Sequence, residues 1–539
     1  MKNFKKSLVV LFVATMSACT LQETPDTSKR GIITIAAETV QERVAANAAE
    51  TKTVMYGEET RWVADSDRIG IFSPQAKPTS DGSAPTNNAA FTALNSAKNS
   101  NFSGSLYWGS DSNHNFYAYY PYNSGYAGDQ TAVPISLPSE QNQSAAGNSD
   151  HIGALDYMVA TPRTVASGST VNLTFNHVFS MIELQLVGSG QLTKVTLIGA
   201  DPLACEGTID LSQTPSTNTY AIIPGSTSNY VSVTLETPVT LSETAISVYM
   251  MVLPGLQTQS MHIALKTDGT WKVIDKEALF VEEAFTRGPA DRGFLRGQKY
   301  VVSLDSESAG WSRTLTDSRD SNVYDLVVIG GQIWMAENLA YLPSVVGPGT
   351  SSNSVPYYYV YGYNGTDIAT AKNTDNYNTY GVLYNWPAAM NGAASSATNP
   401  SGVQGICPAG WHLPSDAEWT QLENYLIANG YNYNGTTVGN MIAKSMATDS
   451  GWTVSSTTGA VGNTDYPDYR NKSGFSALPG GCLGNFSAFT SIDNAGFWWG
   501  STVSSSDYSR RCGLEYNSIS LGKSENLKKY GFSIRCIRN

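Results

Sequence analysis

Between Gly31 and Leu304 the sequence is a series of short runs in which apolar and polar residues alternate, separated by Gly, Asn, Ser and Pro. Period-two alternation places the apolar side chains on one face of a β-strand. No long amphipathic helix pattern interrupts the series, so we predict a mainly β fold. About 270 residues are enough for two β-sandwiches in tandem, and we divide them into residues 31–165 and 166–305. The runs are Ile33/Ile35/Ala37, Val171/Leu173/Phe175, Ile182/Leu184/Leu186, Val195/Leu197, Ile246/Val248/Met250/Val252 and Tyr300/Val302/Leu304.

The pattern changes after Asp305. Residues 306–322 are polar and lose all periodicity, which predicts a short linker. Residues 323–539 carry aromatic clusters, glycine-rich turns and four of the six cysteines. We therefore expect a separate C-terminal domain of α+β type.

One helix is well marked in this domain, in the string PSDAEWTQLENYL. Ser415 and Glu418 have the spacing of a capping box, in which each side chain satisfies a backbone amide of the first turn. Trp419, Leu422 and Leu426 form the apolar stripe, and Gly430 is placed to end the helix.

The N-terminus begins with lysines and an apolar run too short to span a membrane, and we predict a secretory signal peptide over residues 1–18. The string Met16-Ser17-Ala18-Cys19 resembles the lipobox of bacterial lipoproteins. The resemblance implies cleavage before Cys19 and lipid on its thiol, with residues 19–30 as a tether at the outer membrane. An ordinary signal cleavage, with Cys19 incidental, is the alternative.

Four strings of the first half resemble the fimbrillin family, the lipoprotein-derived pilus subunits of Bacteroidetes. They are RWVADSDRIGIFS, NFYAYYPY, LTFNHVFSMIELQL and RGQKYVVSLD. The resemblance implies two transthyretin-like β-sandwich subdomains, trimming after an arginine in an N-terminal loop, and assembly with other fimbrial subunits by donor-strand exchange.

That mechanism agrees with the residues at the start of the mature chain. The string GIITIAAETV, Gly31 to Val40, has the pattern of a first strand. Its loss would leave a hydrophobic groove with unpaired backbone groups. The polar, alanine-rich loop that follows is suited to proteolysis, and we predict cleavage after Arg43, with Arg30 as the alternative.

Four strings of the second half, which span it in order, look like the Fibrobacter succinogenes major paralogous domain family. They are YDLVVIGGQIWMAENLAYL, YGVLYNWPAAMNG, GICPAGWHLPSDAEWTQL and YGFSIRCIRN. The family is similar to C-type-lectin-like folds, which implies that fold for residues 323–539. By the same resemblance we expect disulfides between Cys407 and Cys536 and between Cys482 and Cys512; the residues alone allow three pairings. Cys205 is expected to be a buried small hydrophobe.

Several classes of function lack support. The net charge of −12 argues against nucleic acid as a partner. The motifs of nucleophilic hydrolases, zinc proteases and nucleotide-binding loops are missing, so we predict no enzyme and no cofactor. The sugar-binding calcium triplets of lectins are also missing, and no metal ligand is predicted.

Two aromatic runs, PYYYVYGYNG and Phe497-Trp498-Trp499, remain as candidates for ligand contact. Exposed aromatic faces bind carbohydrate and partner proteins, and we select Tyr358, Tyr361 and Trp499. Together the features indicate a cell-surface fimbrial tip or minor subunit, an adhesin with a lectin-like head for a glycan or protein. The alternative is a lipid-anchored surface glycan- or protein-binding lipoprotein that never polymerises.

Overall fold

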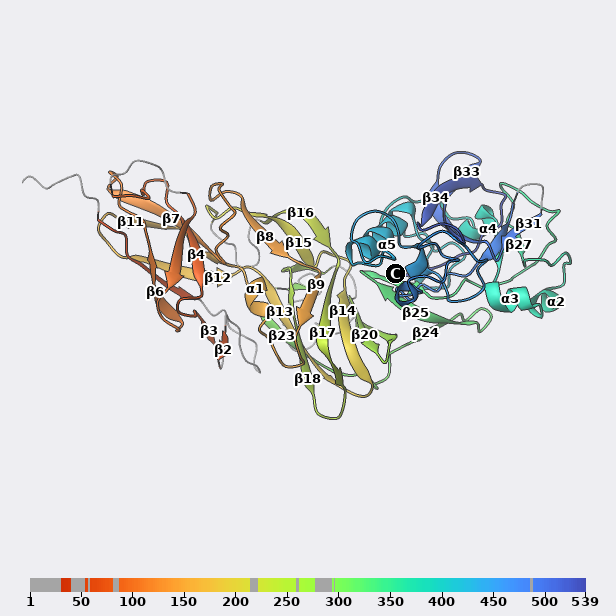
Figure 1. Cartoon of the computed structure of the whole chain (residues 1–539), viewed down its shortest axis with the longest axis horizontal. Coiled ribbons are helices and arrows are strands. Elements are labelled where there is room, and N and C mark those ends of the chain that lie inside the picture. Colours follow the sequence, from red (N-terminus) through yellow and green to blue (C-terminus); the bar gives the residue numbers. More distant parts are fainter. Residues whose placement is uncertain are drawn as a thin grey trace, which may run out of the picture.

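The computed structural model describes residues 31–39, 54–56, 59–80, 87–213, 222–257, 261–276, 293–294, 296–484 and 488–539. Three bodies follow one another along the long axis (Figure 1). We call them the N-terminal lobe, the middle lobe and the C-terminal domain. Each has its own large cluster of buried apolar side chains. The predicted mainly β architecture is confirmed.

The N-terminal lobe is built from one sheet of eight strands, in the order β10-β12-β1-β6-β5-β4-β7-β11. An additional pairing of β10 with β7 closes the hydrogen-bonded ladder on itself. The strands surround a core that includes Trp62, Phe91 and Phe175. They are β1 (Ile35–Thr39), β4 (Arg68–Phe72), β5 (Ala89–Ala93), β6 (Asn99–Gly104), β7 (Asn113–Tyr120), β10 (Met158–Ala160), β11 (Arg163–Ala166) and β12 (Val171–His177), with a hairpin of β2 (Val54–Tyr56) and β3 (Glu59–Arg61).

The middle lobe packs three sheets around one core, in the orders β18-β13-β23, β21-β20-β14-β17-β9 and β16-β15-β8. The alternating residues predicted for β13, β14 and β18 fall in that core, apart from the half-buried Ile246. The elements are β8 (Val133–Leu137), β9 (Glu140–Gln143), α1 (Ile152–Leu155), β13 (Ser180–Val187), β14 (Gln191–Ile198), β15 (Ala204–Ile209), β16 (Ile222–Ser228), β17 (Tyr230–Thr240), β18 (Ile246–Val252), β19 (Gly255–Leu256), β20 (Met261–Thr267), β21 (Thr270–Lys276), β22 (Gly293–Phe294) and β23 (Lys299–Asp305).

The boundary between these lobes differs from the predicted division between residues 165 and 166. Strands β8 and β9 pair within the middle lobe, whereas the later strands β10 and β12 return to the N-terminal lobe. The chain thus crosses between the lobes after β7, before β10 and after β12. Alternation identifies a strand and its buried face, but long-range pairing decides which sheet the strand joins.

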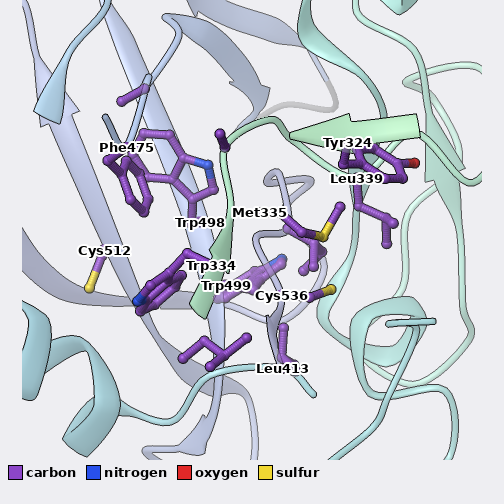
Figure 2. Close-up of a cluster of buried hydrophobic side chains, with 14 of the residues drawn as sticks. Tyr324, Trp334, Met335, Leu339, Leu413, Phe475, Trp498, Trp499, Cys512 and Cys536 are labelled. Atoms are coloured by element: carbon purple, nitrogen blue, oxygen red, sulfur yellow. The ribbon is translucent and has the colours of Figure 1, made fainter. Parts of the chain in front are cut away.

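The C-terminal domain contains two five-stranded sheets, β24-β25-β26-β35-β29 and β31-β30-β32-β33-β34, with short helices around them. Between the sheets lies a cluster of large aromatic side chains that includes Trp334, Phe475, Trp498 and Trp499 (Figure 2). The strands are β24 (Thr314–Thr316), β25 (Val323–Ile329), β26 (Gln332–Met335), β27 (Tyr358–Tyr359), β28 (Leu383–Tyr384), β29 (Trp411–His412), β30 (Gly480–Leu483), β31 (Phe489–Ile492), β32 (Ala495–Val503), β33 (Tyr508–Glu515), β34 (Gly522–Leu527) and β35 (Ile537–Arg538). The helices are α2 (Ile368–Lys372), α3 (Asp375–Tyr380), α4 (Trp386–Met390), α5 (Asp416–Ala428) and α6 (Ala443–Met446).

The predicted helix is α5, and its local chemistry is as expected. The Ser415 hydroxyl accepts from the Glu418 amide, and the Glu418 carboxylate accepts from the Ser415 amide at 2.9 Å, which completes the capping box. Trp419, Leu422 and Leu426 are buried. Gly430 has φ of 71°, the left-handed conformation that lets glycine end a helix.

The segment predicted as a linker, residues 306–322, is structured. Ser312 forms a β-bridge with Val273 of β21, and β24 lies within the segment and pairs with β25. Lys272 donates to the Ser306 carbonyl at 3.0 Å. A polar sequence without periodicity does not reveal such contacts, because they depend on backbone groups and on a partner far away in sequence.

The middle lobe and the C-terminal domain share a buried interface. Tyr230, Trp271 and Val273 of the middle lobe belong to the same apolar cluster as the C-terminal core. The rings of Tyr230 and Tyr425 lie edge to face, with centroids 6.1 Å apart. These contacts hold the C-terminal domain directly against the middle lobe.

Candidate functional site

The first candidate site is β1, the strand predicted for assembly. It lies inside the N-terminal sheet, parallel to β12 and antiparallel to β6. Its register runs from Ile35 opposite Val171 to Thr39 opposite Phe175 on one side, and Ile35 lies opposite Phe102 on the other. Both edges of β1 are therefore paired.

The side chains of β1 alternate as the sequence predicts. Ile35, Ala37 and Thr39 are buried, whereas Ala36 is half-buried and Glu38 is exposed. Ile33, just before the strand, is also buried, and its amide donates to the Leu106 carbonyl at 2.8 Å. If β1 left the sheet, β6 and β12 would become free edges on either side of an apolar groove.

The residues predicted for lipidation and trimming, Cys19, Arg30 and Arg43, lie outside the described residues. Their roles stay predictions. Among the described residues, no helix is long and apolar enough to cross a membrane.

One of the two expected disulfides is present. Cys407 and Cys536 are joined across a sequence separation of 129, and both are fully buried. Cys536 directly precedes β35, and its carbonyl accepts from the Met335 amide at 3.1 Å. The bridge thus ties the segment before α5 to the last strand of the domain.

The expected Cys482–Cys512 disulfide was wrong, because both cysteines are free and buried. Cys482 lies on β30 and Cys512 on β33, and β32 separates these strands in the sheet. Two strand spacings amount to about 9.5 Å, beyond the roughly 7 Å that a disulfide spans between Cα atoms. The Cys482 thiol instead lies 3.4 Å from the Thr490 hydroxyl. Cys205 is free and buried, as predicted.

Two of the three selected aromatic residues are not available to a ligand. Trp499 is fully buried, lies in the central aromatic cluster (Figure 2), and donates from its indole nitrogen to the Tyr384 carbonyl at 2.9 Å. Tyr358 is buried on β27. Both strands have covered faces, so alternation did not bring these rings to the surface. Tyr361 is partly exposed and packs against Phe489, and its binding role stays a prediction.

A partly exposed aromatic pair that the sequence analysis missed lies elsewhere in the domain, formed by the half-buried Tyr433 and the exposed Tyr466. The rings of Tyr433 and Tyr466 are 4.9 Å apart, and Tyr466 is 41% exposed. Tyr466 has φ of 48°, an uncommon conformation for a bulky residue. Neither tyrosine stands in an aromatic run, so the sequence offered no signal.

A buried polar network joins the start of α5 to residue 539. His412 Nε2 lies 2.7 Å from a Glu418 carboxylate oxygen, and His412 Nδ1 lies 2.8 Å from the Asn539 side-chain oxygen. Burial disfavours the imidazolium, but the hydrogen bond and charge of Glu418, with help from Asn539, hold the pKa of His412 above its usual value. Since Glu418 is also part of the capping box, this network stabilises the start of α5.

In the part of the chain that the structure describes, no group of three or more His, Cys, Asp and Glu side chains could hold a metal ion. Burial raises the pKa of the Cys205 thiol to about 11, which keeps the thiol protonated at neutral pH.

Comparisons with known proteins match two parts of the chain to two different family models. Residues 48–305 match the family model described as fimbrillin-like, and residues 327–538 match the Fibrobacter succinogenes major domain. No functionally curated protein matches the chain.

Several solved structures are similar at low identity. A putative cell adhesion protein from Bacteroides uniformis is 17% identical, with 52% of this chain and 95% of that one covered and a TM-score of 0.33. A fimbrial protein from Bacteroides ovatus is 13% identical, with 95% and 99% covered and a TM-score of 0.23. The fimbrial anchor protein Mfa2 from Porphyromonas gingivalis is 9% identical, with 57% and 97% covered and a TM-score of 0.26.

Proposed function

Because the chain joins a fimbrillin-like region to a Fibrobacter succinogenes major domain, we propose that it is a fimbrial tip or minor subunit of the cell surface, an adhesin without enzymatic activity. In this proposal the chain is exported as an outer-membrane lipoprotein through Cys19 and is trimmed after Arg43. It then accepts a donor strand from a neighbouring subunit and displays a lectin-like C-terminal head.

The observation that carries the proposal is the position of β1 between β12 and β6. A strand with two paired edges leaves a gap that another extended segment can fill with the same ladder of hydrogen bonds. Burial of Ile35 contributes about 1.5–3 kcal/mol, so an empty gap is unfavourable and a replacement strand with apolar residues at alternate positions is favoured.

The C-terminal domain supports a terminal position in the pilus. The last strand of the fimbrillin-like region, β23, pairs with β13 and continues into the structured segment 306–322. A strand held in this way is not free to be donated to the next subunit. The chain is therefore suited to accept a strand but not to pass one on.

The lipid-anchored, unpolymerised surface binder is the second candidate. It is favoured by the same paired state of β1, because a permanently anchored protein must keep this strand together with Cys19. The two candidates differ in the N-terminus of the mature protein.

The test is to identify that N-terminus on intact cells by terminal sequencing and mass, for the native chain and for Arg43→Ala, Arg30→Ala and the control Arg163→Ala. Arg163 is an exposed arginine of the same lobe. The proposal expects a start at Val44 and high-mass polymers, both lost in Arg43→Ala alone. A chain that still begins at acylated Cys19 in cells that make pili would refute strand exchange and favour the anchored binder.

A further inference from the structure

A groove lies between the middle lobe and the C-terminal domain. One wall is α5, and the other is formed by β15, β16 and the residues around Glu140. Figure 1 shows β16 on the side of the middle lobe that is nearest to α5. Its volume is about 1110 Å³. Ordinary small-molecule pockets measure roughly 300–1,000 Å³, so this groove has room for an extended ligand.

The helix presents a second face to this groove. Trp419, Leu422 and Leu426 point into the domain core, whereas Ala417, Gln421, Asn424 and Ala428, spaced three and four residues apart, line the groove. The capping box and the His412–Glu418 contact fix α5 at its start. The contact of Tyr425 with Tyr230 fixes it against the middle lobe. The groove is therefore held open by rigid elements.

The lining is rich in neutral hydrogen-bonding groups. Amides and hydroxyls come from both walls: Asn229, Asn399, Gln421, Asn424, Asn429, Thr420, Ser226, Thr227 and Ser228. The exposed Asn424 amide makes no side-chain hydrogen bond within the described part of the chain. Such groups both donate and accept, as sugar hydroxyls do.

The charge of the groove is negative or neutral. Among its described lining residues there is no lysine or arginine, and two are glutamates. Glu140 is paired with Lys194 at 2.8 Å, which leaves the exposed Glu206 as the uncompensated charge. Burial together with the Glu140 charge raises the pKa of Tyr230 and Tyr425, so both hydroxyls stay neutral. An acidic ligand would meet like charge here.

We propose that this groove binds a neutral oligosaccharide, with the amides of Gln421 and Asn424 on α5 and the polar side chains of β15 and β16 contacting its hydroxyls. Among its described lining residues there is no tryptophan or arginine, two of the three usual anchors of protein interfaces, and its tyrosines, Tyr230 and Tyr425, pack against each other. This inference deepens the binding part of the proposed function and rests on it, but it is independent of strand exchange.

The test is to probe the purified full chain on an array of neutral hexasaccharides of glucose, mannose, galactose and xylose, with hexagalacturonate as the acidic match. Binding of the best neutral probe is then titrated by calorimetry. We expect a neutral hexasaccharide to bind, hexagalacturonate to bind at least tenfold more weakly, and Asn424→Ala to lower affinity up to about tenfold. Ala428→Trp, which fills the groove from an exposed position, should abolish binding.

The matched controls are Asn378→Ala and Asn378→Trp, at an exposed asparagine of α3 that does not line the groove. Both should bind like the native chain. The inference is overturned if no neutral probe binds, if hexagalacturonate binds better, or if binding survives Ala428→Trp; binding of a peptide in place of sugar would overturn it too. A chain that binds sugar but keeps acylated Cys19 would refute assembly alone.

Discussion

The Cys407–Cys536 disulfide offers a quantitative test of how the C-terminal domain is stabilised. A cross-link restricts the unfolded chain, and for a sequence separation of 129 the chain-entropy relation gives about 5 kcal/mol at 25 °C. Removing the bridge by Cys407→Ala with Cys536→Ala should therefore lower the free energy of unfolding of this domain by about 4–5 kcal/mol. Both sites are fully buried, so replacement adds small cavities and no exposed group.

The assay is urea unfolding followed by tryptophan fluorescence, because the buried Trp334, Trp419, Trp498 and Trp499 all report on this domain. Reduction of the native chain should give the same loss as the double variant. The control is Cys205→Ala, which removes a free buried cysteine of the middle lobe and should leave this transition in place. A loss below about 1 kcal/mol would show that the bridge does not restrain the unfolded domain as argued.

Three further predictions concern buried contacts. Because the pKa of His412 is raised in the folded state, the stabilising contribution of this residue should be fully present below pH 6.5 and decline as pH rises through the higher folded pKa. The measurement is the free energy of unfolding of the native chain minus that of His412→Gln, from pH 5.5 to 9. This difference should decrease with pH, and a flat difference would refute the contact with Glu418. Trp499→Ala should destabilise the C-terminal domain by about 3–5 kcal/mol, since it deletes a fully buried ring and the donor to the Tyr384 carbonyl. The measurement is urea unfolding, and a near-native midpoint of the unfolding transition would contradict the burial of this ring. A Cβ at Gly331 of the C-terminal domain would lie 2.4 Å from Asn229 Oδ1 of the middle lobe. Gly331→Ala should therefore loosen the interface between the middle lobe and the C-terminal domain and speed proteolysis within residues 306–322. An unchanged rate of proteolysis would argue against close packing at this interface.

Local patterns fixed much of the secondary structure. The capping box at Ser415 and Glu418 and the stripe from Trp419 to Leu426 predicted α5, because a helix end and a buried helix face both depend on residues within a few positions of one another. Alternation likewise predicted β1 and the buried faces of the strands. The Cys407–Cys536 pairing came from a family resemblance, and the structure contains it.

Contacts between distant residues could not be derived in this way. Strand order, to which residues far apart in sequence contribute, decides which lobe each strand joins. It places β8 and β9 in the middle lobe and β10 and β12 in the N-terminal lobe, and it places β32 between the strands of Cys482 and Cys512. The aromatic run around Trp499 was equally misleading, since a strand covered on both faces buries neighbouring rings, here those of Trp498 and Trp499.

The sequence by itself determined the alternating strands and the capped helix α5, because hydrogen-bonding caps and alternating polarity act over short distances. Only the tertiary structure decided which strands share a sheet and which cysteines form a disulfide. It also decided that the polar face of α5 lies opposite the middle lobe across an open groove. Those outcomes depend on packing free energies summed over residues hundreds of positions apart, and no local pattern encodes them.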